Sequence, residues 1–420
     1  MKKEKINEKL FRFIENSPTP FHVVHNCKEV LLENGFTELM ENAEWEIVPQ
    51  GKYFVTRNDS SLIAFSIPEG EFKGFHMAAA HSDSPCFKVK TQPEMDVEKA
   101  YTKLNVEPYG GVVYSSWMDR PLSVAGRIVT KEGTKLVNLD YDSLIIPNLA
   151  IHMNREINKG FAYNPQIDLL PLAGGKLGEK GLFKHLVKEC GINEEEILAH
   201  DLFLYVRQKP AYIGLNKEFI YSPRLDDLQC AFSLISAMAE ENPKEYVNIC
   251  TIFDNEEVGS STKQGADSTF LEDVLERIGE GFYLGKGAMR RKLAESFMIS
   301  ADNAHAMHPN HPEKCDPTNR PVLNGGIVIK YNANQKYTTD AVSAGKMKLL
   351  CEEAKVPYQN FLNRSDEPGG ATLGNISTAH VSVNSVDIGL PQLAMHCSVE
   401  TAGSDDTVYL YKVLKHFYKA

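Results

Sequence analysis

Several common features are missing from this chain of 420 residues, and each absence excludes a class of protein. The eight cysteines are scattered without a Cys-x-x-Cys pair, so the sequence predicts neither a zinc ribbon nor a thiol redox motif. Single, scattered cysteines are typical of a reducing compartment, and we expect a cytoplasmic protein with free thiols. The sequence has no apolar run of about 18 residues, so we expect no membrane-spanning helix. The charged start, Met1 to Lys5, is not followed by the apolar core of a secretion signal.

A basic excess is also missing. Lysine and arginine total 45 against 56 aspartates and glutamates, which gives a formal net charge of -11. This mild acidic balance argues against nucleic acid as the main partner. Hydrophobic residues make up 42% and charged residues 24%, which is ordinary for a globular protein. The sequence shows neither internal repeats nor low-complexity segments, and its length allows two domains.

The pattern of apolar residues predicts an α/β fold in two parts. Strand-like and helix-like segments alternate from residue 220 to 420, which is typical of a sheet covered by helices. Short alternating segments between residues 86 and 215 predict a mostly β insertion. We therefore expect a discontinuous catalytic domain, 1–85 with 216–420, and an inserted domain, 86–215. Within the insertion we predict strands at 86–91, 111–115, 123–130 and 134–138, and helices at 178–190 and 193–199.

One short stretch carries the first chemical signal. An apolar run, Val247 to Phe253, leads to the adjacent acids Glu256 and Glu257. This pattern predicts a strand that brings two carboxylates to its C-terminal tip, where open α/β sheets place their sites. Neighbouring side chains on extended backbone point to opposite sides, so one acid could bind a metal while the other serves as a base. For an isolated pair of glutamates, a solvated loop is the more common explanation.

Four more positions have metal-ligand side chains at or near the end of a predicted element. His81 ends a strand of small residues, and Asp83 follows two positions later. Asp226 precedes a helix pattern, where it could equally be a cap. Asp302 follows a strand, and His396 follows an apolar run. Each signal alone is weak.

Taken together, His81, Asp226, Glu257, Asp302 and His396 form the donor set that a pair of divalent ions needs. Imidazole and carboxylate ligands suit zinc, cobalt or manganese. A bound metal lowers the pKa of its water from about 15.7 to roughly 7. Glu256, left uncoordinated, could take the proton of that water and pass it to a leaving amine.

A glycine-rich stretch, Gly369 to Gly374, is the remaining motif. It lacks a Walker lysine and the glycine order of a dinucleotide fingerprint, so phosphate binding is disfavoured.

The sequence resembles the aspartyl aminopeptidase family, which has co-catalytic zinc ions and includes the vacuolar aminopeptidase I type. The resemblance rests on blocks that occur in the family's order: Ser17-Pro18-Thr19-Pro20-Phe21-His22, His81-Ser82-Asp83-Ser84-Pro85, Arg224-Leu225-Asp226, Asp254-Asn255-Glu256-Glu257-Val258-Gly259-Ser260, Ser300-Ala301-Asp302 with Ala304-His305-Ala306, His308-Pro309-Asn310, and Met395-His396. These blocks cover essentially the whole chain. The resemblance implies a mixed-sheet catalytic domain with an inserted dimerisation domain, and assembly of the dimers into a tetrahedral dodecamer.

The resemblance also implies a role for each matching residue. His81, Asp226, Glu257, Asp302 and His396 match the metal ligands, and Asp226 matches the bridging one. Glu256 matches the general acid/base, and Asp83 the carboxylate that orients His81. His152, to which composition alone assigns a structural role, matches a histidine that reaches the active site of a neighbouring subunit. Lys330, His305 and Tyr337 match residues of the substrate pocket, where a lysine faces the side-chain carboxylate of acidic substrates.

Two departures from the family pattern put the substrate preference in doubt. Asp227 stands where the family often has asparagine, and the residues after His396 differ from those of acid-selective relatives. We therefore expect a metal-dependent aminopeptidase acting on peptides, with Asp or Glu as possible first residues. The alternatives are a di-zinc amidase or deacylase acting on small N-acyl substrates, and a non-enzymatic shell protein with structural metals. An uncoordinated Glu256 disfavours the shell protein.

Overall fold

The computed structural model of the chain describes residues 3–175, 181–188, 190–370 and 372–419. The chain forms two compact units. The first comprises the residues up to Asp83, Pro210–Met395 and the residues from Glu400 onwards; the second comprises Ser84–Lys209 and His396–Val399. These bounds differ from the expected ones for residues 84–85 and 396–399, which belong to the second unit, and for residues 210–215, which belong to the first. Among the described residues, no helix combines the length and apolar character needed to cross a membrane.

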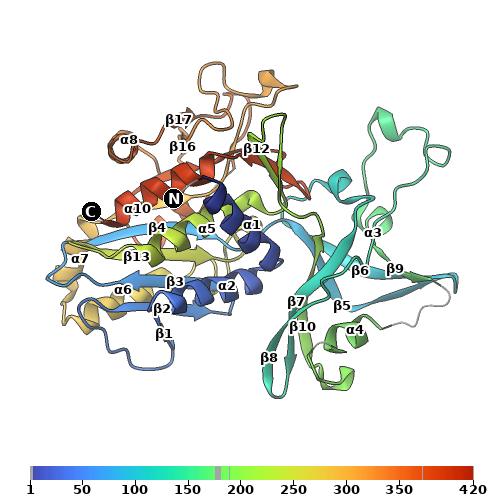
Figure 1. Cartoon of the computed structure of the whole chain (residues 1–420), viewed down its shortest axis with the longest axis horizontal. Helices are drawn as coiled ribbons and strands as arrows, with labels where there is room; N and C mark the ends of the chain where they lie inside the picture. Colours follow the sequence, from blue (N-terminus) through green and yellow to red (C-terminus); the bar gives the residue numbers. More distant parts are fainter. Residues whose placement is uncertain (1–2, 176–180, 189, 371, 420) are drawn as a thin grey trace. The chain divides into compact units, whose positions relative to one another are not determined.

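The first unit is built on a nine-stranded mixed sheet (Figure 1). Its strands, in spatial order, are β1 (Thr37–Leu39), β2 (Lys52–Arg57), β3 (Ser61–Ser66), β13 (Val247–Phe253), β4 (Phe75–His81), β14 (Phe297–Ala301), β18 (Asn384–Gly389), β16 (Ile327–Lys330) and β17 (Tyr358–Phe361). The central strands β13, β4 and β14 are buried along their whole length. Strands that are covered on both faces read as continuous apolar runs, which is why the sequence predicts them well.

Helices cover both faces of this sheet. One core cluster packs the sheet against α1 (Lys3–Asn16), α2 (Pro20–Glu33), α5 (Leu225–Glu240), α8 (Ala341–Glu353) and α10 (Asp406–Lys419). A second cluster, on the opposite face, packs it against α6 (Phe270–Gly281), α7 (Lys286–Ala294) and α9 (Leu373–His380). Alternate strand residues such as Ala78 and Ala79 enter the two different clusters, as the two-residue period of a strand requires.

A smaller sheet completes the first unit. Its order is β11 (Ala211–Ile213), β12 (Phe219–Ser222), β20 (Glu400–Gly403), β19 (Pro391–Leu393) and β15 (Ala304–His305). Because β12 leads into α5 and β15 directly follows β14, this sheet ties together segments that flank the predicted site.

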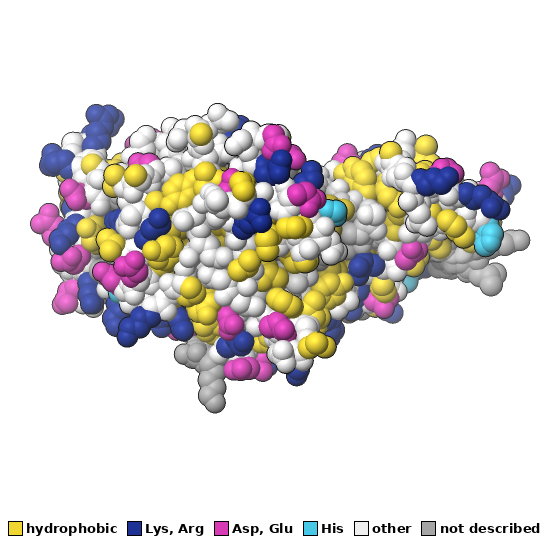
Figure 2. All heavy atoms as spheres, turned by 90° about the horizontal axis from the view of Figure 1, so that it is seen from above, with side chains coloured by type: hydrophobic (Ala, Val, Ile, Leu, Met, Phe, Trp, Pro, Cys, Tyr) yellow, Lys and Arg dark blue, Asp and Glu magenta, His cyan; other side chains and the backbone are white. Residues whose placement is uncertain are grey.

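The second unit is mostly β. Its sheet runs β8 (Gly133–Asn138), β7 (Leu122–Thr130), β10 (Ala199–Val206), β5 (Cys86–Val97), β6 (Tyr101–Tyr109) and β9 (Leu172–Gly175), with the short helices α3 (Pro165–Asp168) and α4 (Leu182–Lys188). Acidic and basic side chains are interspersed on the molecular face shown in Figure 2.

Three predictions within this unit need correction. The strand predicted at 111–115 is wrong, because a 3₁₀ helix begins at Tyr114 and buries Trp117. The helix predicted at 193–199 is a 3₁₀ turn of three glutamates, 194–196, and β10 begins at Ala199. The helix predicted at 178–190 is confirmed only for Leu182–Lys188; residues 178–180 and 189 lie outside the described residues.

Candidate active site

The sheet topology explains why distant residues meet. β4 lies between β13 and β14 and is parallel to both. The register pairs Phe253 with His81 and Ser300 with Ala79, so the three strands end at nearly the same level. Parallel strands present their carboxyl ends at one edge of a sheet, where α/β proteins place their ligands. His81, Glu256 and Asp302 are therefore neighbours there.

The start of α5 brings two more carboxylates to the same edge. The backbone N–H of Asp226 donates to Glu400 Oε2 at 3.0 Å, and Asp227 Oδ2 accepts from the backbone N–H of His81 at 3.2 Å. Arg224, just before the helix, has a left-handed backbone with φ 55°. These bonds fix the first turn of α5 against the end of β4.

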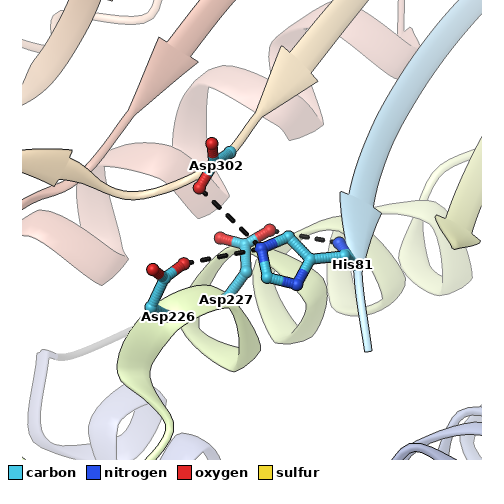
Figure 3. Close-up of side chains that lie close together, drawn as sticks. All are labelled: His81, Asp226, Asp227 and Asp302. Carbon is cyan, nitrogen blue, oxygen red and sulfur yellow. Dashed lines mark hydrogen bonds and ion pairs between the residues drawn. The ribbon is translucent and has the colours of Figure 1, made fainter. Parts of the chain in front are cut away.

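Four side chains form the first group of potential ligands (Figure 3). His81 Nε2 lies 3.5 Å from Asp226 Oδ1 and 3.8 Å from Asp302 Oδ1. Together with Asp227, these residues offer ligand atoms that all lie within 4.8 Å of one another. In Figure 3, the carboxylates of Asp226 and Asp302 point toward the imidazole ring from α5 and from the end of β14.

Asp83 connects His81 to the two glutamates. Its backbone oxygen lies 3.0 Å from His81 Nδ1, and its Oδ1 lies 3.4 Å from that nitrogen. Its carboxylate also accepts from the backbone N–H groups of Glu256 and Glu257, each at 3.2 Å. His81, Glu256 and Glu257 form a second group of ligand atoms within 4.8 Å of one another.

The prediction of extended backbone at the two glutamates is wrong. Glu256–Val258 is a single 3₁₀ turn between Asn255, with φ 61°, and Gly259, with φ 96°. The turn directs both glutamate N–H groups to Asp83. The two side chains therefore do not separate by strand alternation, and their directions are set by this turn.

Burial and crowding of negative charge dominate the electrostatics. Burial, together with the charges of Asp302, Asp83 and Asp226, raises the pKa of Glu256 to about 8 against the lowering effect of His81. Burial and the charge of Asp226 raise the pKa of Glu257 in the same way. Burial lowers the pKa of His81, but the surrounding aspartates, Asp227 first, raise it well above its usual value. Strongly shifted pKa values in one pocket are typical of functional sites.

The donor set fits a divalent cation. Asp227 is fully buried, and its Oδ1 has no hydrogen-bond partner within the described part of the chain. A buried carboxylate oxygen without a donor is costly unless a cation compensates it. Carboxylates plus imidazole are the ligands that zinc, cobalt and manganese accept.

Two predicted residues belong to the second unit. His396 lies in the segment 396–399, where its Nδ1 is 3.2 Å from the backbone oxygen of Gly111. His152 is exposed in a turn between β8 and α3. Their roles as ligand and as active-site residue stay predictions.

The predicted substrate-pocket residues lie in the first unit. Lys330 is 3% exposed, and its Nζ donates to Asp302 Oδ2 at 3.2 Å. The same Nζ lies 5.5 Å from the ring centroid of Tyr337, which is also buried. His305 is exposed, and its ring centroid is 6.3 Å from that of Phe361. Asp302 thus has one oxygen facing His81 and the other facing Lys330.

Sequence reasoning missed two acids at this site. In the sequence, Asp227 stands out only as a departure from the family pattern, and Glu400 lies in the segment after His396 that differs from acid-selective relatives. The adjacency of Asp227 to Asp226 was the one available signal. Glu400 contacts Asp226 across 174 positions, which no local pattern indicates.

Comparison with known proteins identifies the family. Residues 13–418 match the profile of the family described as "Aminopeptidase I zinc metalloprotease (M18)". A protein of Clostridium novyi named "Probable M18 family aminopeptidase 2" is 49% identical, and the match covers 99% of each chain. A protein of the same name from Pseudomonas aeruginosa is 42% identical, with 98% of each chain covered.

Solved structures agree. The structure titled "Cryo-EM structure of the Ape4 and Nbr1 complex" has a TM-score of 0.94 and 36% identity, covering 99% of this chain and 86% of that one. "Structure of S. cerevesiae mApe1 dodecamer" has a TM-score of 0.86 and 27% identity, covering 99% and 96%. The α/β fold that the sequence predicts is therefore confirmed. The chain belongs to the M18 family of aminopeptidases, which are zinc metalloproteases of the hydrolase class.

Proposed function

We propose that this aminopeptidase works with two divalent ions, most simply zinc, and that Glu256 is its general acid/base. His81, Asp226, Glu257, Asp302 and His396 would hold the ions, with Asp226 shared between them. The supporting observation is that His81 belongs to two groups of ligand atoms, one with Asp226, Asp227 and Asp302 and one with Glu256 and Glu257. Such ions supply Lewis-acid activation of the scissile carbonyl and of water.

The side chains themselves move the proton. As a carboxylate beside the ligand atoms, Glu256 would accept a proton from the attacking water and return it to the leaving amine. Asp83 holds the backbone of Glu256 and faces His81 Nδ1, so it keeps the base and the imidazole in one fixed arrangement.

Replacing the base tests this assignment. Glu256→Gln should lower kcat on aminoacyl-p-nitroanilides and on peptides by about 100-fold or more, because proton transfer by a positioned base contributes about that much. Bound metal should stay unchanged by elemental analysis. Glu245→Gln, at an exposed acid paired with Lys73, is the matched control and should keep full activity. Turnover of Glu256→Gln within about tenfold of the original chain would assign the base elsewhere.

We further propose a preference for peptides that begin with Asp or Glu. The support is a buried cation beside the cluster: Lys330 lies under Tyr337 and next to Asp302. Burial lowers the pKa of Lys330, but the charge of Asp302, with Tyr337 and Asp387, raises it above its usual value, so the ammonium stays charged. A fixed ammonium in a low-dielectric pocket attracts a carboxylate more strongly than a solvated one does.

The ratio of kcat/KM for Asp and Leu substrates measures this preference. Lys330→Met should lower the ratio by about tenfold, which corresponds to the loss of about one charge-assisted hydrogen bond. Lys346→Met on α8, away from the cluster, is the control and should leave the ratio unchanged. A chain that cleaves neutral residues as well as acidic ones before any substitution would show that Lys330 does not select substrates.

We also propose that the second unit mediates self-association and that His152 serves the partner's active site. Three residues close to His152 in the sequence, Leu149, Ile151 and Met153, are apolar and exposed, and such groupings are typical of interfaces. The solved relative whose title describes a dodecamer supports assembly. Met153→Asp should lower the mass in solution, whereas Leu215→Asp, at an even more exposed apolar residue of the first unit, should not.

Mixing two inactive variants tests the role of His152. A 1:1 mixture of His152→Ala and Glu256→Gln should recover activity on exchange of subunits, because one site of each mixed dimer then has both residues intact. If His152 serves its own subunit, each site stays defective and the mixture remains inactive.

A further inference from the structure

A buried carboxylate outside the metal cluster joins three separate segments. Asp387, on β18, has no exposed surface. Its Oδ2 accepts from the backbone N–H of Thr338 at 2.6 Å and from the Thr338 hydroxyl at 2.7 Å. Its Oδ1 accepts from the Thr372 hydroxyl at 2.6 Å. A buried carboxylate needs such donors, and both of its oxygens are satisfied here.

The backbone of Asp387 also bonds to the segment that contains Thr338. Its N–H donates to the Thr339 hydroxyl oxygen at 2.9 Å, and its carbonyl accepts from that hydroxyl at 3.4 Å. Residues 338 and 339 are therefore fastened to β18 by side chain and backbone together. This leaves the preceding residue, Tyr337, little freedom to move.

The second segment is the start of α9. Thr372 is the N-cap residue of α9, yet its side chain makes no cap hydrogen bond and donates to Asp387 instead. A threonine N-cap ordinarily stabilises a helix by about 1 kcal/mol. In the first turn of the helix, a Cβ on Gly374 would lie 2.5 Å from Asp387 Oδ1. Part of the glycine-rich stretch is thus explained by the space that this carboxylate needs.

Tyr337, which precedes Thr338, connects the surroundings of Asp387 to Lys330. Its side chain packs with Ala304, Val328 and Phe361, and its ring lies beside the Lys330 ammonium. Lys330 in turn contacts Asp302. A chain of contacts therefore leads from Asp387 through Thr338 and Tyr337 to the pocket.

We infer that Asp387 is a positioning residue of the substrate pocket: by fastening Thr338 and Thr339 it holds Tyr337 beside Lys330. The inference rests on the proposed function, in which Lys330 and Tyr337 line that pocket. The described hydrogen bonds of Asp387 do not involve Glu256 or the potential metal ligands. Substitution of Asp387 should therefore change substrate binding.

Thr338→Val keeps the shape of the side chain and removes one hydroxyl, which donates to Asp387 and accepts from Ser385. It should raise KM for the preferred aminoacyl substrate about tenfold, the equivalent of about 1.4 kcal/mol, and leave kcat within about twofold. Thr338→Ser, which keeps the hydroxyl, should restore KM. Asp387→Asn should raise KM at least as much, because an amide cannot accept on both sides.

Asp406→Asn is the matched control. Asp406 is equally buried and accepts from the backbone N–H groups of Asn324 and Gly326, at the start of α10. This variant should lower Tm and leave KM unchanged. If Thr338→Val and Asp387→Asn also lower Tm without changing KM, Asp387 is purely structural and the inference is overturned. Failure of the original chain to cleave aminoacyl substrates would instead overturn the proposed function. If Asp387→Asn does not fold, the Thr338 pair decides alone.

Discussion

Two buried carboxylates, Asp227 and Asp387, illustrate two uses of the same side chain. Both lie in the first unit, and neither has exposed surface. Asp387 has donors on both oxygens, all from threonines. Asp227 accepts from the backbone N–H of His81 on one oxygen, while its Oδ1 has no partner in the described ranges.

The difference distinguishes an acid satisfied by hydrogen bonds from an acid that belongs to a group of potential metal ligands. Hydrogen-bond donors satisfy both carboxylate oxygens of Asp387, so this buried charge needs no cation. Asp226 and Asp302 lie near Asp227, and burial with their repulsion raises the pKa of Asp227 well above the usual value, against the lowering effects of His81 and Cys230. Only a positive ion can complete that cluster while its members stay charged.

The largest expected effect comes from breaking the incomplete cluster. Asp302→Ala should lower metal affinity and kcat/KM by at least ~100-fold, because it removes a proposed ligand rather than a supporting contact. Elemental analysis and titration with zinc measure this directly. Asp387→Asn should bind zinc as the original chain does. Equal loss of metal in both variants would contradict the difference between Asp387 and the metal cluster.

Two substitutions in the glycine-rich stretch test the surroundings of Asp387, and their expected effect is smaller than that of Asp302→Ala. Gly374→Ala places a methyl group 2.5 Å from Asp387 Oδ1, whereas Gly370→Ala has no atom within 4 Å of the new Cβ. Replacing a helical glycine by alanine ordinarily gains up to about 1 kcal/mol, but overpacking costs about 1–3 kcal/mol. We therefore expect Gly374→Ala to lower Tm and raise KM, and Gly370→Ala to change neither.

The smallest expected effect is a change in pH dependence at Asp406. Burial raises the pKa of Asp406 to about 7, although the N–H groups of Asn324 and Gly326 oppose this. An acid whose pKa is raised on folding stabilises the fold fully below its unfolded pKa of about 3.8, and this contribution is lost as pH rises to about 7. Asp406→Asn removes the titration, so its unfolding free energy should decline less between pH 4 and 7. Urea unfolding at both pH values measures the slope; an unchanged slope would contradict the shift.

The elements that the sequence predicted well are those with strong periodicity. The strands ending at His81, Phe253 and Ala301 are confirmed, because each is a buried apolar run. α9 was missed, since its start lies in a glycine-rich stretch whose meaning depends on Asp387. The short 3₁₀ turn at Glu256 was also missed, because it depends on an acceptor 173 positions away.

The site follows the same rule. Residues at the tips of parallel strands could be expected to converge, because topology places such tips together. The sequence did not indicate the surroundings of three further acids, Asp387, Glu400 and Asp227. Their hydrogen-bond partners are distant in the sequence, and a sequence does not show which carboxylate oxygens have a donor. Only the three-dimensional contacts distinguish a carboxylate with donors on both oxygens from one with a donor on a single oxygen.

Asp83 has one more consequence. Because a single carboxylate faces the imidazole of His81 and accepts from two successive amides of the glutamate turn, these parts are joined as one rigid body. Thermal motion should therefore displace His81 and the glutamate turn together, and their separation should vary less than the distance of either from the rest of the site. Such a connection preserves the spacing of His81 and the two glutamates even while the surrounding loops fluctuate.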